Sequence, residues 1–161
     1  MTQRHRLPVV LLICAALAAP EESFALLQSC SVSATAVNFG TYNPLSGSTT
    51  QSTGTVTVVC QVLLVGLFVS WTVTLSTGSS GSYVARQLKS GANSLSYNLY
   101  TDAARTLVWG DGTGGTSVVS ANPFLVVGTN TVNYTAYGSI PAAQDRPAGS
   151  YTDTVTVTMT Y

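Results

Sequence analysis

Hydrophobic and polar residues alternate almost perfectly along the last segment of the sequence, from residue 150 to residue 161. One set of positions carries threonines, and the other carries Val155, Val157, Met159 and Tyr161. Successive side chains of a β-strand point to opposite faces, so a two-residue period predicts a strand with one apolar face. The pattern runs to the last residue without the lysine, proline or bulge that usually protects a strand edge. We therefore expect this edge to be covered, by another strand of this chain or by another molecule.

Shorter alternating segments precede it and are separated by clusters of glycine, serine, asparagine and proline, the usual punctuation of β-proteins. A hairpin turn is predicted at 78–81, and longer loops are predicted at 111–115 and 141–149. The predicted strands are residues 32–39, 55–60, 71–75, 83–88, 95–100, 131–137 and the C-terminal segment. About seven strands, with no helical period after the N-terminal segment, predict an all-β protein whose single domain is an antiparallel β-sandwich.

The run from Val62 to Trp71 is apolar except for one glycine and one serine, and it is too short to span a bilayer. Two interpretations remain open. We favour a buried strand that leads into Trp71. The alternative is a loop exposed at one end of the domain, where Leu64 and Phe68 would form an adhesive apolar surface.

Residues 1–25 have the pattern of a secretory signal peptide. Basic residues at 4–6 precede an apolar stretch at 7–19, and small residues at Ser23 and Ala25 suit a signal peptidase. We expect cleavage after Ala25, with a cut near Ala18 as the weaker alternative, which leaves one domain at 26–161. The protein is then exported through the periplasm to the cell surface or beyond it, with no transmembrane segment after processing.

Residues 26–161 contain no histidine and no glutamate, and their four basic residues balance four aspartates. This composition offers no basic patch for nucleic acid. It also offers few groups for acid–base, nucleophilic or metal catalysis, so we expect no enzyme and no cofactor, an aspartate-only hydrolase being the remaining possibility. Asp102 and Asp111 are interpreted as turn-forming, because a calcium ion needs six or more oxygen ligands at close spacing.

Cys30 and Cys60 are the two cysteines of residues 26–161. In an exported protein an isolated pair predicts one disulfide. A metal or redox pair is disfavoured, because the spacing is far from CxxC and no histidine could complete a zinc site.

Several blocks of the sequence resemble the spore coat protein U family, which includes the subunits of archaic chaperone–usher pili. The blocks are Cys30-Ser31-Val32 followed by NFGTYNP at 38–44, STGTVTVVC at 52–60, LSYNLYTDAARTLVWGDGTGG at 95–115 and PAGSYTDTVTVTMTY at 147–161. The resemblance covers nearly all of residues 26–161. The sequence departs from the family at 62–68, where a shorter and more polar connection is expected.

The resemblance implies an incomplete immunoglobulin-like sandwich that lacks its last strand. A periplasmic pilus chaperone would first lend a strand, and a neighbouring pilin would then replace it after passage to the outer-membrane usher. By this resemblance Cys30 and Cys60 would join the first strand to the second, and the chaperone would bind the carboxylate of Tyr161. The acceptor groove would be lined by Val155, Val157, Met159 and Tyr161.

The N-terminal arm carries a further expectation. Cleavage after Ala25 leaves four residues before Cys30, whereas a donor strand needs about ten or more residues at about 3.3 Å each. We therefore expect a subunit that accepts a strand without donating one, at the pilus tip or as a minor subunit. Two alternatives remain: a standalone secreted coat or matrix protein, and a carbohydrate-binding sandwich that uses Trp109 or the tyrosines as stacking platforms.

Overall fold

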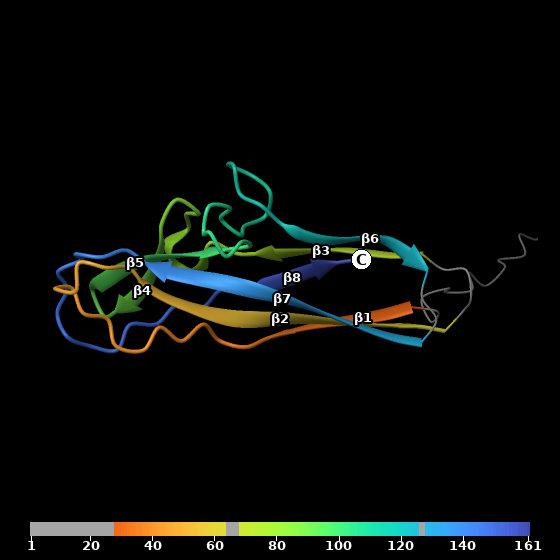
Figure 1. The fold of residues 1–161 in the computed structure, drawn as a ribbon, viewed down its shortest axis with the longest axis horizontal. Coiled ribbons are helices and arrows are strands. Elements are labelled where there is room, and N and C mark those ends of the chain that lie inside the picture. The colour runs from red at the N-terminus through yellow and green to blue at the C-terminus, as the bar shows by residue number, and fades with distance from the viewer. Residues whose placement is uncertain (1–27, 64–67, 126–127) are drawn as a thin grey trace, which may run out of the picture.

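Two antiparallel sheets form the fold in the computed structural model, which describes residues 28–63, 68–125 and 128–161 (Figure 1). The larger sheet has the strand order β1-β2-β7-β5-β4, and the smaller sheet has the order β6-β3-β8. The strands of the larger sheet are β1 (Gln28–Ala34), β2 (Thr50–Val62), β4 (Arg86–Ser90), β5 (Asn93–Tyr100) and β7 (Gly128–Ile140). Those of the smaller sheet are β3 (Phe68–Leu75), β6 (Val119–Leu125) and β8 (Val157–Thr160). The prediction of an all-β antiparallel fold is confirmed.

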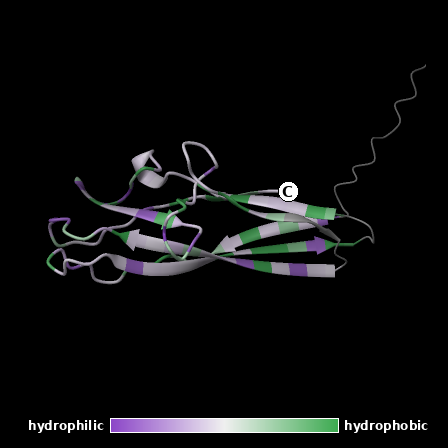
Figure 2. Cartoon of the chain, turned by 45° about the horizontal axis from the view of Figure 1, so that its top comes forward, coloured by the Kyte–Doolittle hydropathy of each residue, from purple (hydrophilic) through white to green (hydrophobic). Residues whose placement is uncertain are grey.

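The long central strands β2 and β7 form the spine of the larger sheet. They pair over their whole length, from Thr50 opposite Ile140 to Val62 opposite Gly128. Every second residue of β2 from Val56 onward is buried, and the intervening residues are more exposed. Figure 2 shows apolar residues as green bands interspersed with paler ones along the strands. The two-residue period therefore turns one face of this sheet toward the core.

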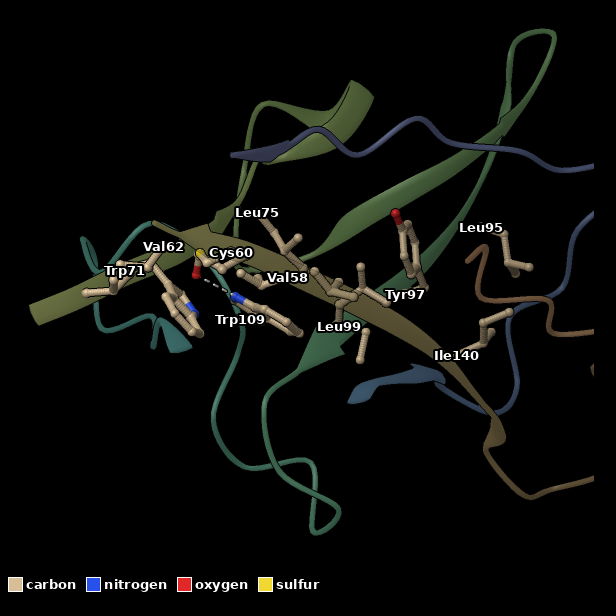
Figure 3. Packing of buried hydrophobic residues seen from close by; sticks show 14 residues of the cluster. Val58, Cys60, Val62, Trp71, Leu75, Leu95, Tyr97, Leu99, Trp109 and Ile140 are labelled. Atoms are coloured by element: carbon tan, nitrogen blue, oxygen red, sulfur yellow. Dashed lines mark hydrogen bonds between the residues drawn. The ribbon is translucent and has the colours of Figure 1, made fainter. Parts of the chain in front are cut away.

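The core lies between the two sheets and is built largely from valines and aromatic residues (Figure 3). In β3, Trp71, Val73 and Leu75 are buried, as their alternation predicts. The indole nitrogen of the fully buried Trp109 donates a hydrogen bond to the Val73 carbonyl at 3.1 Å. The indole of Trp71 donates to the Tyr134 hydroxyl at 3.0 Å. Both buried indole N–H groups therefore have acceptors, as burial requires.

Strand β1 ends at Ala34, before the end of the strand predicted at 32–39. Residues 35–39 cross buried glycines of β2 and β7. A side-chain Cβ at Gly54 would lie 2.8 Å from the Thr35 carbonyl, and one at Gly138 would lie 2.6 Å from the ring of Phe39. The predicted strand at 32–39 is therefore corrected to a short strand followed by a crossing segment, which packs Phe39 against the core.

The described residues contain eight strands, one more than predicted. The additional strand is β6. The predicted hairpin turn at 78–81 is wrong, because the short 3₁₀ turn Gly78–Ser80 joins β3 to β4, which belong to different sheets. The predicted strand at 83–88 begins only at Arg86.

The C-terminal segment is not one continuous strand, although its alternation suggested one. Thr152 first pairs with Lys89 of β4 in the larger sheet, through two backbone hydrogen bonds of 2.7 and 3.0 Å. The chain then crosses at 153–156, and β8 pairs with β3 in the smaller sheet. The segment therefore ties the two sheets together.

The apolar run at 62–71 is divided between two strands and their connection. Val62 ends β2 and is buried, but Leu63 is 71% exposed and Phe68, the first residue of β3, is 68% exposed. The favoured interpretation of one buried strand is therefore wrong for Leu63 and Phe68. Leu64 lies outside the described residues, so its exposure stays untested.

Candidate functional site

Two edge strands, one from each sheet, border the candidate site. β1 is the edge of the larger sheet and β8 is an edge of the smaller sheet, and the two strands lie close to each other. In the described part of the chain, β1 pairs only with β2, and β8 pairs only with β3. The second edge of each strand therefore presents backbone N–H and C=O groups that another strand could bind.

Apolar side chains follow these two edges. Val155, Val157 and Met159 pack against the core from the C-terminal segment, and Val32 packs against it from β1. All four are half-buried, whereas the inward-facing residues of β2 from Val56 onward are buried. The threonines between the apolar residues of the C-terminal segment are exposed. The predicted inward and outward faces of residues 155–160 are therefore the ones the structure has, and the role of the inward row stays a prediction.

Tyr161 differs from the other three residues predicted for the groove. It lies beyond the end of β8 and is 57% exposed. It borders a shallow cavity together with Ser70, Thr72 and Thr160. The packed apolar row therefore ends at Met159.

The predicted disulfide is confirmed and lies next to this edge. Cys30 of β1 and Cys60 of β2 are directly opposed in the strand register, and their sulfurs are 2.08 Å apart. Cys60 is buried in the core, and Cys30 packs against it. The bond fastens edge strand β1 covalently to the central strand β2, so it holds one wall of the candidate site.

A buried polar network lies where the C-terminal segment crosses between the sheets. The Asp153 carboxylate accepts hydrogen bonds from the Tyr97 hydroxyl at 2.7 Å and from the Ser79 backbone N–H at 2.8 Å. Burial, and next the hydrogen bond to Asp153, raise the pKa of Tyr97, so its hydroxyl stays protonated and donates. Asp153 thereby links the crossing segment to β5 and to the 3₁₀ turn.

Arg86 occupies the centre of the same region and is fully buried. Its guanidinium donates to the Ser76 carbonyl, to the Asn98 side-chain oxygen at 2.7 Å and to the Trp109 carbonyl at 2.7 Å. Burial lowers the pKa of Arg86, and the nearby Tyr97, Tyr83 and Asp153 side chains, in that order, act in the opposite direction. This network was not predicted from the sequence. The one sign of the network in the sequence is Asp153, the single charged side chain between residues 150 and 161.

The other aspartates of interest shape turns. The Asp102 carboxylate accepts hydrogen bonds from the backbone N–H groups of Thr106 and Leu107, and the Leu107 bond is the largest cause that lowers the pKa of Asp102. Asp111 accepts from Thr113 in the same manner. The turn-forming interpretation is confirmed. Among the described residues, no three His, Cys, Asp or Glu side chains are placed to hold a metal ion.

Trp109 cannot serve as the sugar-stacking platform considered from the sequence, because it is fully buried between the sheets. Its hydrogen bonds, to the Val73 carbonyl, the Arg86 guanidinium and the Leu99 carbonyl, are all internal. That alternative is therefore wrong for Trp109, whose indole is a core group, and it stays untested for the tyrosines. No helix within the described ranges has the length and apolar character needed to cross a membrane.

Residues 16–158 match the family described as the Spore Coat Protein U domain. The chain belongs to this family. It is 34% identical over 138 residues to Protein U of Myxococcus xanthus, an alignment that covers 78% of this chain and 71% of that protein. The resemblance noted from the sequence blocks is therefore confirmed.

A solved structure shares the fold. It is the CsuC–CsuE chaperone–tip adhesion subunit pre-assembly complex from the archaic chaperone–usher Csu pili of Acinetobacter baumannii. One of its chains superposes with a TM-score of 0.55 and 26% sequence identity over 84% of this chain. The matched part is 40% of that chain, so this chain spans less than half of its length.

The predicted signal peptide at 1–25 lies outside the described residues.

Proposed function

We propose that this chain is a structural subunit of a chaperone–usher pilus and that it accepts a donor strand between β1 and β8. The observation that carries this proposal is the row of half-buried apolar residues, Val155, Val157 and Met159, beside the edge of β8 that pairs with no strand in the described part of the chain. The family and the similarity to a chain of the Csu chaperone–subunit complex support it.

An added strand would satisfy two requirements of this edge at once. Its backbone would pair with the free N–H and C=O groups, and its alternate side chains would cover the apolar row. Moving one such side chain from full exposure to complete burial stabilises the complex by about 1.5–3 kcal/mol. The proposed occupants are a periplasmic pilus chaperone first and a neighbouring pilin afterwards, with the outer-membrane usher as the site of exchange.

Export is part of the proposal. Residues 1–25 would direct the chain to the periplasm and be removed, and residues 26–161 would form the assembled domain at the cell surface or in the fimbria. The oxidised pair Cys30–Cys60 suits this route, since disulfides persist in the periplasm and outside the cell. The role is one of structure and binding rather than catalysis.

We further propose an adhesive position at the tip. The matched complex contains a subunit described as a tip adhesion subunit. In this chain Leu63 and Phe68 expose apolar side chains where β2 ends and β3 begins, at one end of the sandwich (Figure 1). Together with Leu64 of the same connection, they are the candidates for contact with an apolar surface.

A second candidate function is a secreted coat protein that assembles without an usher. The family description and the similarity to Protein U favour it. The two candidates differ in what completes the fold. A pilus subunit needs a donated strand, whereas a coat protein would have to be stable alone or with copies of itself.

The test is export of the full chain to a bacterial periplasm with and without a pilus chaperone of the archaic class. We expect low recovery alone, and a stable one-to-one complex with a cooperative thermal transition when the chaperone is present. A well-folded monomer whose yield does not depend on the chaperone would contradict the strand-acceptor proposal. Homopolymers formed without a chaperone would favour the coat protein.

A further inference from the structure

The C-terminal segment has an ambiguous register, because its sequence repeats every two residues. From Thr152 to Thr160 every even position is a threonine, and the odd positions 155, 157 and 159 are apolar. A slide of one residue would exchange the two faces, but a slide of two residues would preserve both. Alternation alone therefore cannot fix how β8 aligns with β3.

The backbone contacts of this segment do not resolve the ambiguity. Thr152 exchanges two backbone hydrogen bonds with Lys89, and Thr156 binds Ser76 through its own N–H and C=O, each at 2.9 Å. These bonds use only main-chain atoms of the segment, which any non-proline residue supplies. A chain displaced by two residues would form the same set. Tyr151 donates its hydroxyl to the Pro147 carbonyl, a local contact that can move with the segment, but its side chain also packs against the core, and a slide would bring Asp153 to that position.

Asp153 is the exception, because its side chain makes contacts that no other residue of the segment could make. Its carboxylate receives the Tyr97 hydroxyl and the Ser79 N–H, and it also accepts the N–H of Thr154 at 2.9 Å. A Cβ on Gly78 would lie 2.2 Å from the carboxylate, and Gly78 has a φ of +65°. The turn is thus shaped to admit this carboxylate closely.

A two-residue slide would place Val155 in this polar pocket. The Tyr97 hydroxyl, which is buried, and the Ser79 N–H would both lose their acceptor. Unpaired buried polar groups are costly, so the loss of the Asp153 contacts opposes the slide, in addition to the loss of the Tyr151 packing.

We propose that Asp153 is a positioning residue that sets the register of β8 and thereby selects the side chains presented to an incoming strand. In the observed register Met159 opposes Val73, and Thr158 opposes Thr74. After a slide of two residues Tyr161 would oppose Val73. The consequence for strand binding rests on the function proposed above, but the register itself does not.

Paired cysteines report the register directly. In the full chain, Thr74→Cys with Thr158→Cys joins positions that oppose each other, and Thr74→Cys with Thr160→Cys joins positions that meet only after the slide. Cross-links formed under mild oxidation are identified by mass spectrometry. With Asp153 present, we expect the first pair alone to cross-link. With Asp153→Ala, we expect the second pair to cross-link at a yield comparable with the first.

Matched variants separate register from general damage. Thr154→Ala, an exposed neighbour, should retain the native preference, and Tyr97→Phe should weaken it in the same direction as Asp153→Ala. If Asp153→Ala is not recovered, Asp153→Val, which has no side-chain acceptor, and Tyr97→Phe decide. An unchanged preference for the native pair in these variants overturns the proposal, and so does cross-linking of both pairs when Asp153 is present. Failure of every form to bind a chaperone or donor strand would instead count against the proposed function.

Discussion

Val73 and Met159 are direct partners across β3 and β8, yet Val73 is fully buried and Met159 is only half-buried. The difference arises from their neighbours. β3 lies between β6 and β8, whereas β8 has a strand on one side only within the described residues. The unequal burial of this pair locates the place where the sandwich is open.

A charge on the inward face of the C-terminal segment should be far more harmful than one on its outward face. Met159→Asp places a carboxylate against the core and should lower the free energy of unfolding by about 2 kcal/mol or more. Thr158→Asp, one residue away and exposed, should change it by about 0.5 kcal/mol or less. Periplasmic yield with the chaperone and the thermal midpoint measure the difference. Equal effects would mean that the inward row does not form the groove.

Loss of the disulfide should weaken the wall formed by β1. The chain-entropy relation for a loop of about 31 residues gives about 3.7 kcal/mol, which is a large part of the stability of a domain. Cys30→Ser and Cys60→Ser should each reduce periplasmic recovery severely, and the double variant should behave like either single one. Thiol labelling of the unfolded, unreduced protein should find no reactive cysteine in residues 26–161. Two labelled cysteines there would contradict the bond.

The alternating segments of the sequence predicted the core well, because a two-residue period follows directly from strand geometry. Trp71 and Val73 are buried as this period requires. β6 escaped prediction because Asn122 and Pro123 are typical of a turn, yet proline is tolerated on an edge strand such as β6.

Features that depend on distant contacts could not be read from the sequence. β1 ends early because residues 35–39 cross Gly54 and Gly138, which are far apart in the chain. The role of Asp153 depends on Tyr97, which lies 56 residues away. Hydropathy alone also could not distinguish buried Val69 from exposed Phe68, since both belong to one apolar run.

Removal of the buried guanidinium should destabilise the domain strongly. Arg86→Met would leave the Ser76 and Trp109 carbonyls and the Asn98 side-chain oxygen without their donor, at a cost of about 3 kcal/mol or more. The matched control is Arg146→Met, which removes an exposed arginine and should have little effect. Thermal midpoints of the two variants give the comparison. Similar midpoints would show that the Arg86 network contributes little to stability.

Tyr97 should make the domain sensitive to alkaline pH. Burial raises the pKa of Tyr97 above its ordinary value of 10.0. Its contribution to stability is therefore complete below pH 10, where the tyrosine is also neutral in the unfolded chain, and is lost as the pH rises above 10. Tyr97→Phe should reduce the decline of the unfolding free energy above that pH. A decline of the same steepness in the variant would contradict this assignment.

The exposed apolar end should mediate adhesion without contributing to folding. Phe68 and Leu63 are mostly exposed, so Phe68→Ser and Leu63→Ser remove little buried surface and should leave secretion and the thermal midpoint nearly unchanged. They should reduce retention of the protein on a hydrophobic surface such as polystyrene, because less apolar area leaves water on contact. Val69→Ser is the matched control, since Val69 follows Phe68 but is buried and should impair folding instead. If the Phe68 and Leu63 variants are retained as well as the unchanged protein, this end of the sandwich is not part of the adhesive surface. Loss of secretion in those variants would mean that their side chains are covered in the folded protein.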